Sequence, residues 1–120
     1  MKRIALSAVL LALPLGANAG YVNGYSVQKM ANMWAHNKRV PKAAVSPDEA
    51  ATIFEFGGYV RGVVDLAMAR QILCIGHVQF NEIAQAVADY VEAHSDIRDR
   101  NGEDVVLDAL KDKYSCPTPK

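Results

Sequence analysis

Three histidines and two cysteines are the side chains of this chain that best suit acid–base, nucleophilic or metal chemistry. His94-Ser95-Asp96 contains the three residue types of a hydrolase triad. Adjacent residues point apart, however, so these side chains do not converge on one line of proton transfer. His36 and His77 add no motif, and metallohydrolase, nucleophile-elbow and P-loop patterns do not occur. The sequence therefore predicts a protein that is not an enzyme.

Cys74 and His77 have the C-x-x-H spacing of half a metal site, or of a cysteine nucleophile beside a base. No second pair of ligands follows them, so a metal site is incomplete. The other cysteine is Cys116, and only one pairing is possible. The redox compartment of the protein decides between a disulfide and two reactive thiols.

Three glycines interrupt one apolar segment, where each costs about 1 kcal/mol relative to Ala in a helix. They are Gly57, Gly58 and Gly62. A phosphate-binding loop would follow a strand and precede Lys-Ser or Lys-Thr, which this segment does not do. Gly58 and Gly62 stand on one helix face, where the missing side chains favour close approach of a second helix. Arg61 and Asp65, in the same segment, are predicted to form a surface ion pair.

Residues 1–19 have the three regions of a secretory signal peptide in the correct order. They comprise the basic Lys2 and Arg3, an apolar run from Ile4 to Leu15, and the cleavage motif Ala17-Asn18-Ala19 before Gly20. The apolar run is too short for a permanent anchor, and no cysteine for lipidation stands at the cut. We expect an exported domain, residues 20–120, with no membrane attachment after cleavage.

The charge balance changes when the signal peptide is removed. The whole chain has 13 basic and 13 acidic residues, and without Lys2 and Arg3 the basic count is 11 and the net charge −2. This charge, with no basic stripe, disfavours nucleic-acid binding. A length of 120 residues suits one domain, and a 51% hydrophobic composition excludes a disordered chain.

Export gives the two cysteines a structural interpretation. An even number of cysteines in an oxidising compartment predicts a disulfide between Cys74 and Cys116. Closing this loop stabilises a fold by about 4 kcal/mol in the chain-entropy model. For so small a domain, that is a large share of the net stability.

Helical periodicity recurs along the rest of the chain, and no strand pattern of useful length is present. We predict helices over 26–38, 46–72 and 79–93, and a fourth that follows the charged segment 96–104 and ends near Lys113. Ser46-Pro47-Asp48-Glu49 begins the second helix with an N-cap, a proline at the first position and a capping box. The residues predicted to face the core are Val27, Met30, Met33 and Trp34; Ile53, Phe56, Val60, Val63, Val64, Ala67 and Met68; Phe80, Ile83, Ala84, Val87, Tyr90 and Val91; and Val105, Val106, Ala109, Leu110 and Tyr114. The predicted fold class is all-α, a small four-helix domain with one disulfide.

Several segments, taken in order, resemble the Rap/Tai immunity proteins. Phe56-Gly57-Gly58-Tyr59-Val60-Arg61-Gly62-Val63-Val64-Asp65 is similar to the family's G-Y-x-x-G-v-x-D core. Cys74 follows, and the next helix ends in Val87-Ala88-Asp89-Tyr90-Val91-Glu92-Ala93-His94. The closing Ala109-Leu110-Lys111-Asp112-Lys113-Tyr114-Ser115-Cys116 is similar to an A-L-x-x-x-Y-P-C ending, and Asn23-Gly24 fits the family's start. The resemblance covers most of residues 22–117.

The sequence departs from the family pattern at three places. Ser95 and Ser115 stand where the family usually has proline, after the third helix and before the last cysteine. Phe56 occupies one position of a second cysteine pair that many relatives carry, and only Met30 or Met33 stands near the other. Because both of these cysteines are absent together, no thiol is left unpaired.

The resemblance implies an all-helical periplasmic protein, usually a homodimer, that protects bacteria against the peptidoglycan amidase effectors of type VI secretion. It implies that the protein binds such an amidase and occludes its Cys-His active site. An inhibitor of this kind needs no catalytic residue, cofactor or metal of its own.

The polar segment between the third and fourth helices is the candidate surface for the effector. Its candidate residues are Ser95, Asp96, Arg98, Asp99, Arg100 and Asn101. Charges of both signs at a helix–helix corner steer and orient a partner. The alternative interpretation is that these side chains are solvated turn residues.

Two other functions fit a small exported helical domain with one disulfide. An acid-stress chaperone of the HdeA/HdeB type would dissociate and expose apolar surface at about pH 2–3, where dye binding and client protection would identify it. An orphan relative of the immunity proteins would bind a different partner and would lack a neighbouring amidase gene.

Overall fold

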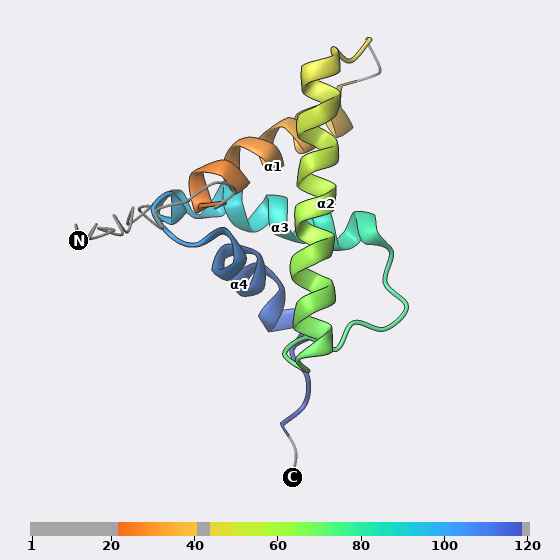
Figure 1. Cartoon of the computed structure of the whole chain (residues 1–120), viewed down its shortest axis with the longest axis vertical. Helices are drawn as coiled ribbons and strands as arrows, with labels where there is room; N and C mark the ends of the chain where they lie inside the picture. Colours follow the sequence, from red (N-terminus) through yellow and green to blue (C-terminus); the bar gives the residue numbers. More distant parts are fainter. Residues whose placement is uncertain (1–21, 41–43, 119–120) are drawn as a thin grey trace, which may run out of the picture.

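The computed structural model describes residues 22–40 and 44–118, which form an all-α domain (Figure 1). The four α-helices are α1 (Gly24–Arg39), α2 (Pro47–Ala69), α3 (Phe80–Ala93) and α4 (Gly102–Tyr114). A short 3₁₀ helix, η1 (Ser95–Ile97), lies between the last two. The prediction of a four-helix domain is therefore confirmed. The predicted signal peptide, residues 1–19, lies outside the described residues.

The long helix α2 crosses the other helices, as the yellow-to-green ribbon in Figure 1 shows. α1 packs against both α2 and α3, while α4 packs against α3 and, less extensively, against α1 and α2. Each helix therefore has at least two packing partners, which is how one apolar face on each closes a single core.

Side-chain caps fix the beginnings of α1 and α2. The side chain of Asn23 accepts a hydrogen bond from the backbone N–H of Ser26 at 3.0 Å. Ser46 and Glu49 form the predicted capping box: Ser46 Oγ accepts from the N–H of Glu49 at 3.3 Å, and the Glu49 carboxylate accepts from the N–H of Ser46 at 3.0 Å. These bonds satisfy N–H groups that the first helical turn leaves without partners.

α2 ends at Ala69, before the predicted end near Ile72. The cause is Gln71, whose φ of 58° lies in the left-handed region and stops the helix. The N–H groups of Ile72 and Leu73 then bond back to the carbonyl of Ala67. No glycine or proline marks this turn in the sequence, so apolar periodicity alone extended the helix too far.

The predicted disulfide between Cys74 and Cys116 is confirmed. Leu73 and Ser115 form an isolated antiparallel bridge beside it, and the N–H of Cys74 donates to the carbonyl of Tyr114 at 2.8 Å. The disulfide ties the connection between α2 and α3 to the end of α4. Because both sulfurs are engaged, neither is free to act as a nucleophile or metal ligand.

Apolar side chains from all four helices form one core. Its buried residues are Val27, Met30, Ala31, Trp34, Ala35, Phe56, Val60, Val63, Val64, Ala67, Leu73, Ile83, Ala84, Val87, Ala88, Val91, Ile97, Val105, Val106, Leu107, Leu110 and Tyr114. Of the predicted core residues, five are only partly buried: Met33, Ile53, Phe80, Tyr90 and Ala109. The prediction for Met68 is wrong: it is 41% exposed, because the buried stripe of α2 passes through Val64 and Ala67 instead. Leu73 and Ile97, which lie in connections where periodicity gives no signal, complete the core.

The prediction that a second helix packs closely on Gly58 and Gly62 is wrong within the part of the chain that the structure describes. Both glycines are exposed, and a Cβ atom added at either would meet nothing within 4 Å. Gly57 is the glycine of this segment that has a neighbour, because a Cβ there would lie 3.8 Å from the ring of Phe80. The exposed glycines leave one side of α2 open.

The predicted ion pair between Arg61 and Asp65 is also not formed among the described residues. The guanidinium of Arg61 lies over the ring of Phe80 instead, 4.3 Å from the centroid. Contact with an aromatic face shields one side of a guanidinium while its N–H edges stay in water, which competes well with a solvent-exposed ion pair.

Candidate functional site

The six candidate residues lie in one continuous segment between α3 and α4, residues 95–101, here called the η1 corner. Ser95 and Asp96 belong to η1, and the remaining candidates, Arg98, Asp99, Arg100 and Asn101, lead into α4. Ile97 is fully buried and anchors the η1 corner in the core. All six candidates are exposed except Arg100, which is partly buried. Polar side chains therefore surround one apolar anchor.

The backbone at the start of α1 is hydrogen-bonded to the η1 corner. The N–H of Gly24 donates to the carbonyl of Arg100 at 2.7 Å, and the N–H of Tyr25 donates to the carbonyl of Arg98 at 3.1 Å. Position 24 requires glycine, because an added Cβ would lie 1.7 Å from the carbonyl oxygen of Ile97. Backbone groups make these contacts, so the contacts use none of the polar side chains of the η1 corner.

A second close approach occurs where α4 begins. A Cβ added to Gly102 would lie 2.7 Å from both the carbonyl oxygen of Val22 and the hydroxyl of Tyr59. The N–H of Gly102 donates to the same Val22 carbonyl at 2.9 Å, and Asn23 forms an antiparallel bridge with Asn101. Residues from before α1, from α2 and from α4 thus brace the η1 corner.

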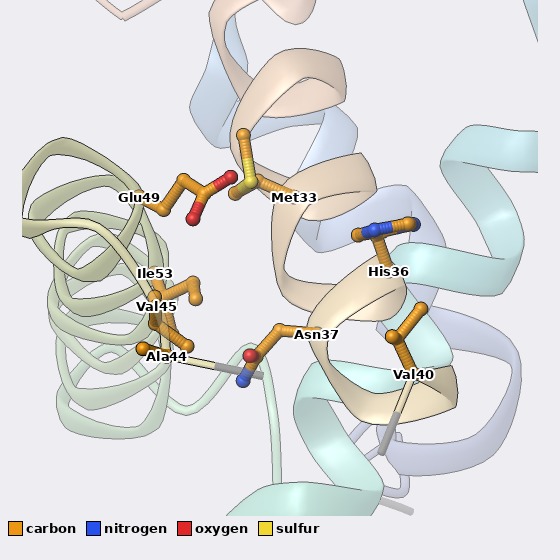
Figure 2. Close-up of a pocket in the computed structure, with 8 residues that line it drawn as sticks. All are labelled: Met33, His36, Asn37, Val40, Ala44, Val45, Glu49 and Ile53. Carbon is orange, nitrogen blue, oxygen red and sulfur yellow. The ribbon is translucent and has the colours of Figure 1, made fainter. Parts of the chain in front are cut away.

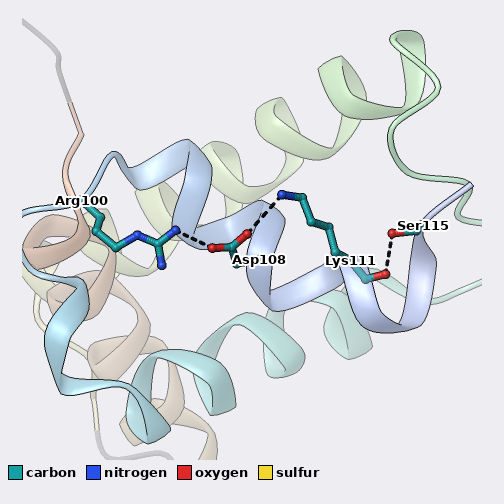
Figure 3. A network of polar contacts seen from close by, with 4 residues as sticks. All are labelled: Arg100, Asp108, Lys111 and Ser115. Atoms are coloured by element: carbon teal, nitrogen blue, oxygen red, sulfur yellow. Dashed lines mark hydrogen bonds and ion pairs between the residues drawn. The ribbon is translucent and has the colours of Figure 1, made fainter.

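An ion pair joins Arg100 to α4, as Figure 3 shows. The guanidinium of Arg100 donates to the carboxylate of Asp108, whose other oxygen accepts from the ammonium of Lys111 at 3.2 Å. The hydrogen bond from Arg100 is the main reason that the pKa of Asp108 lies below its ordinary value. The same bond raises the pKa of Arg100. Arg100 is thereby held against α4.

Three charges of the η1 corner have no ionic partner. Asp96, Arg98 and Asp99 form no ion pair with any residue in 22–40 or 44–118. Arg98 lies over the ring of Tyr25 instead, with its guanidinium carbon 4.6 Å from the centroid. Sequence reasoning missed Tyr25, because nothing in its local pattern connects it to Arg98. Asn23 does signal where α1 begins, but not which segment lies beside it.

His94 lies next to the η1 corner, and its ring is engaged with Tyr90. Its Nδ1 donates to the backbone carbonyl of Tyr90 at 2.7 Å, and the two rings stack with centroids 3.9 Å apart. No hydrogen bond joins His94 to Ser95 or Asp96 in the described structure, so the geometry does not assemble a triad from these neighbours.

The described residues, 22–40 and 44–118, contain neither a metal-binding cluster nor a membrane-spanning helix. No group of three or more His, Cys, Asp and Glu side chains there is arranged to hold a metal ion. No helix in these ranges has the length and apolar character needed to cross a membrane.

Two of the hollows in the described structure lie beside α2, away from the η1 corner. A cavity of about 190 Å³ lies between the end of α1 and the start of α2, and Figure 2 shows its lining of Met33, His36, Asn37, Val40, Ala44, Val45, Glu49 and Ile53. An apolar groove of about 390 Å³ runs along α2, lined by Trp34, Ile53, Phe54, Gly57, Gly58, Arg61 and Phe80. The carboxylate in the cavity, Glu49, already serves the capping box. Neither hollow brings a nucleophile together with a base and its orienting group.

The sequence model of the Rap1a immunity proteins matches residues 38–116. This range contains α2, α3, the η1 corner, α4 and both cysteines. No curated protein and no solved structure gives a match to the chain. The family model covers more than half of the chain and agrees with the resemblance expected from the glycine-rich segment and the cysteine ending. The protein therefore belongs to the family of Rap1a immunity proteins.

Proposed function

We propose that this immunity protein acts in the periplasm, where it binds a peptidoglycan amidase effector of type VI secretion and occludes the amidase's Cys-His active site. Family membership supplies the immunity role and implies a partner effector. The disulfide is compatible with an oxidising compartment, and the expected signal peptide, residues 1–19, supports export.

The η1 corner is the proposed contact surface for the amidase. The observation that carries this proposal is a set of exposed, unpaired charges, Asp96, Arg98 and Asp99, on a segment whose backbone is braced from behind. A braced segment loses little conformational freedom on binding, so more of its interaction energy remains as affinity. Ser95 adds a hydrogen-bonding group beside these charges, while Arg100 and Asn101 keep the segment in place.

Inhibition of the amidase tests the proposed function. Residues 20–120 are mixed with a purified peptidoglycan amidase effector from the same bacterium, and release of peptidoglycan fragments is followed. We expect release to fall to the background level once inhibitor and amidase are equimolar. Full amidase activity at about a tenfold molar excess of inhibitor, with both proteins at micromolar concentration, would contradict the amidase proposal. The immunity role towards another effector would survive that result.

We also propose a homodimer formed through an exposed stripe on α2, here called the α2 face (Phe54, Gly58, Gly62 and Leu66). Phe54 is 79% exposed and Leu66 is 42% exposed, and the two glycines between them are open. The spacing of four residues places all of them along one side of the helix. A two-fold antiparallel pairing would bring the glycines of both copies together and set Phe54 against Leu66 of the partner subunit.

The variant Gly62→Leu tests dimer formation without destabilising the protomer. Leucine suits a helix better than glycine by about 0.8 kcal/mol, and no described atom lies near a Cβ at this position, so the protomer should be at least as stable. Self-association should weaken because leucine blocks the close approach. Sedimentation equilibrium measures this, with Asp112→Leu on exposed α4 surface as the control. Equal self-association of wild type and Gly62→Leu would exclude the α2 face as the interface.

A further inference from the structure

The pair formed by Tyr25 and Arg98 is an unassigned feature of the surface. Tyr25 is 48% exposed and Arg98 is also exposed, yet the guanidinium is not free in solvent, because it lies 4.6 Å above the tyrosine ring. Tyr25 comes from α1 and lies outside the residues 38–116 that the family model matches.

The backbone holds both members of this pair in place. The N–H of Tyr25 donates to the carbonyl of Arg98 itself, at 3.1 Å. On either side of this bond, Gly24 is bonded to Arg100 at 2.7 Å, and Ile97 is fully buried. The ring and the guanidinium therefore start from fixed backbone positions, and stacking restricts the long arginine side chain further.

The arrangement leaves the N–H groups at the edge of the guanidinium unused. The Arg98 side chain forms no hydrogen bond or ion pair with any other described residue, although Asp96 and Asp99 belong to the same segment. The guanidinium carbon lies over the face of the Tyr25 ring, so a partner can reach the N–H groups from the side away from the ring. The chemical group that fits a guanidinium edge best is a carboxylate, which accepts two parallel N–H bonds.

We propose that Tyr25 and Arg98 together form the receiving site for a carboxylate on the surface of the effector. Arg98 makes the contact, and Tyr25 is a positioning residue that holds the guanidinium edge outward. This inference rests on the proposed function, since it names the group that the η1 corner recognises. It also extends the contact surface from the η1 corner to the first turn of α1. Arg and Tyr are among the residue types that dominate binding energy in protein interfaces.

Binding of four single variants and one double variant to a purified peptidoglycan amidase effector from the same bacterium, measured by calorimetry, tests the proposal. Tyr25→Phe retains the ring and should bind within about twofold of wild type, because the ring face holds the guanidinium. Tyr25→Leu retains apolar bulk without the ring and should bind about fivefold more weakly. Arg98→Met should bind at least about tenfold more weakly, and adding Tyr25→Leu to it should cause little further loss. Arg98→Lys should fall between wild type and Arg98→Met, because an ammonium lacks the planar fork.

Two controls keep these outcomes interpretable. Each variant should unfold at the wild-type temperature, because both side chains are exposed. Raising the salt concentration should weaken wild-type binding more than binding of Arg98→Met, as expected when a charge pair is removed.

Wild-type affinity in Tyr25→Leu, or losses that multiply in the double variant, would overturn the positioning role. Equal losses in Tyr25→Phe and Tyr25→Leu would assign the contact to the tyrosine hydroxyl and overturn it as well. In each of these cases the wild type still inhibits the amidase, so the proposed function stands. A wild type that does not bind the amidase overturns both.

Discussion

Glycine has two opposite roles in this chain, and neither is visible from composition. Gly24 and Gly102 are sites of close backbone approach, where an added Cβ would clash with a carbonyl oxygen. Gly58 and Gly62 have open space around them, although they stand in the segment whose spacing predicted close packing. The surroundings of a glycine in the folded structure therefore determine whether its position requires the absence of a side chain.

Gly24→Ala and Gly58→Ala should change stability in opposite directions. The first places a Cβ against the carbonyl of Ile97 and should lower the free energy of unfolding by about 2 kcal/mol or more, because backbone has to move. The second should raise it by up to about 1 kcal/mol through helix propensity alone. Urea unfolding at neutral pH measures both. If Gly24→Ala unfolds at the wild-type midpoint, α1 does not brace the η1 corner as described.

The ion pair at Asp108 predicts a pH dependence with a definite sign. The pKa of Asp108 is lowered in the folded protein by Arg100, so its contribution is fully present above the ordinary carboxyl pKa, about 4, and is lost as pH falls through the folded value. Asp108→Asn should therefore be less stable than wild type at neutral pH, and the two should converge in strong acid. Melting temperatures between about pH 7 and pH 2 measure this, with exposed Asp112→Asn as the control. A difference that persists in strong acid would show that the loss is unrelated to ionisation.

At the scale of helices and connections, sequence periodicity predicted most of the fold. The four helices, the capping box at Ser46 and the disulfide between Cys74 and Cys116 all follow from local pattern or from counting. Periodicity did not give the left-handed turn at Gln71, because that turn depends on bonds back to the end of α2. It also gave no sign that Ile97 is buried, since η1 is too short to show a period.

The candidate site was predictable only in part, because local sequence patterns do not reveal contacts between segments far apart in the chain. The η1 corner is one continuous segment, so its polar composition marks it in the sequence. Tyr25 reaches it through backbone bonds between segments far apart in the chain, and one sequence contains no record of such a contact. The unpaired state of Arg98 and the paired state of Arg100 likewise depend on which neighbour lies within reach.

The disulfide should support the end of α4 more than the η1 corner. It joins the α2–α3 connection to the segment after Tyr114, at the opposite end of α4 from Gly102. Replacing Cys74 and Cys116 together with Ser should lower the free energy of unfolding by up to about 4 kcal/mol. Hydrogen exchange should speed up first near Tyr114, and amidase binding at low temperature should persist. Loss of binding by a variant that remains folded would place the contact surface at the disulfide end.

At the scale of the whole molecule, the helical core holds the η1 corner at one end of α4 and the disulfide at the other. The two ends of α4 are held in different ways. The disulfide at Cys116 follows its end, and residues 95–101, held by backbone hydrogen bonds, precede its start. The long α2 crosses the bundle and leaves the α2 face open on the outside. Such a division fits an inhibitor, because recognition needs a rigid polar surface and the core needs only to hold it in position.

The affinity of residues 20–120 for a peptidoglycan amidase effector from the same bacterium, with and without the charges of the η1 corner, tests the central claim most directly. Asp96→Ala combined with Arg98→Ala should weaken binding at least about tenfold without lowering the melting temperature. The matched control, Arg70→Ala combined with Asp112→Ala, removes the same charges near the disulfide end and should bind as the wild type does. Equal affinity of all three proteins would contradict the assignment of the η1 corner, and no binding by the wild type would contradict the amidase as partner.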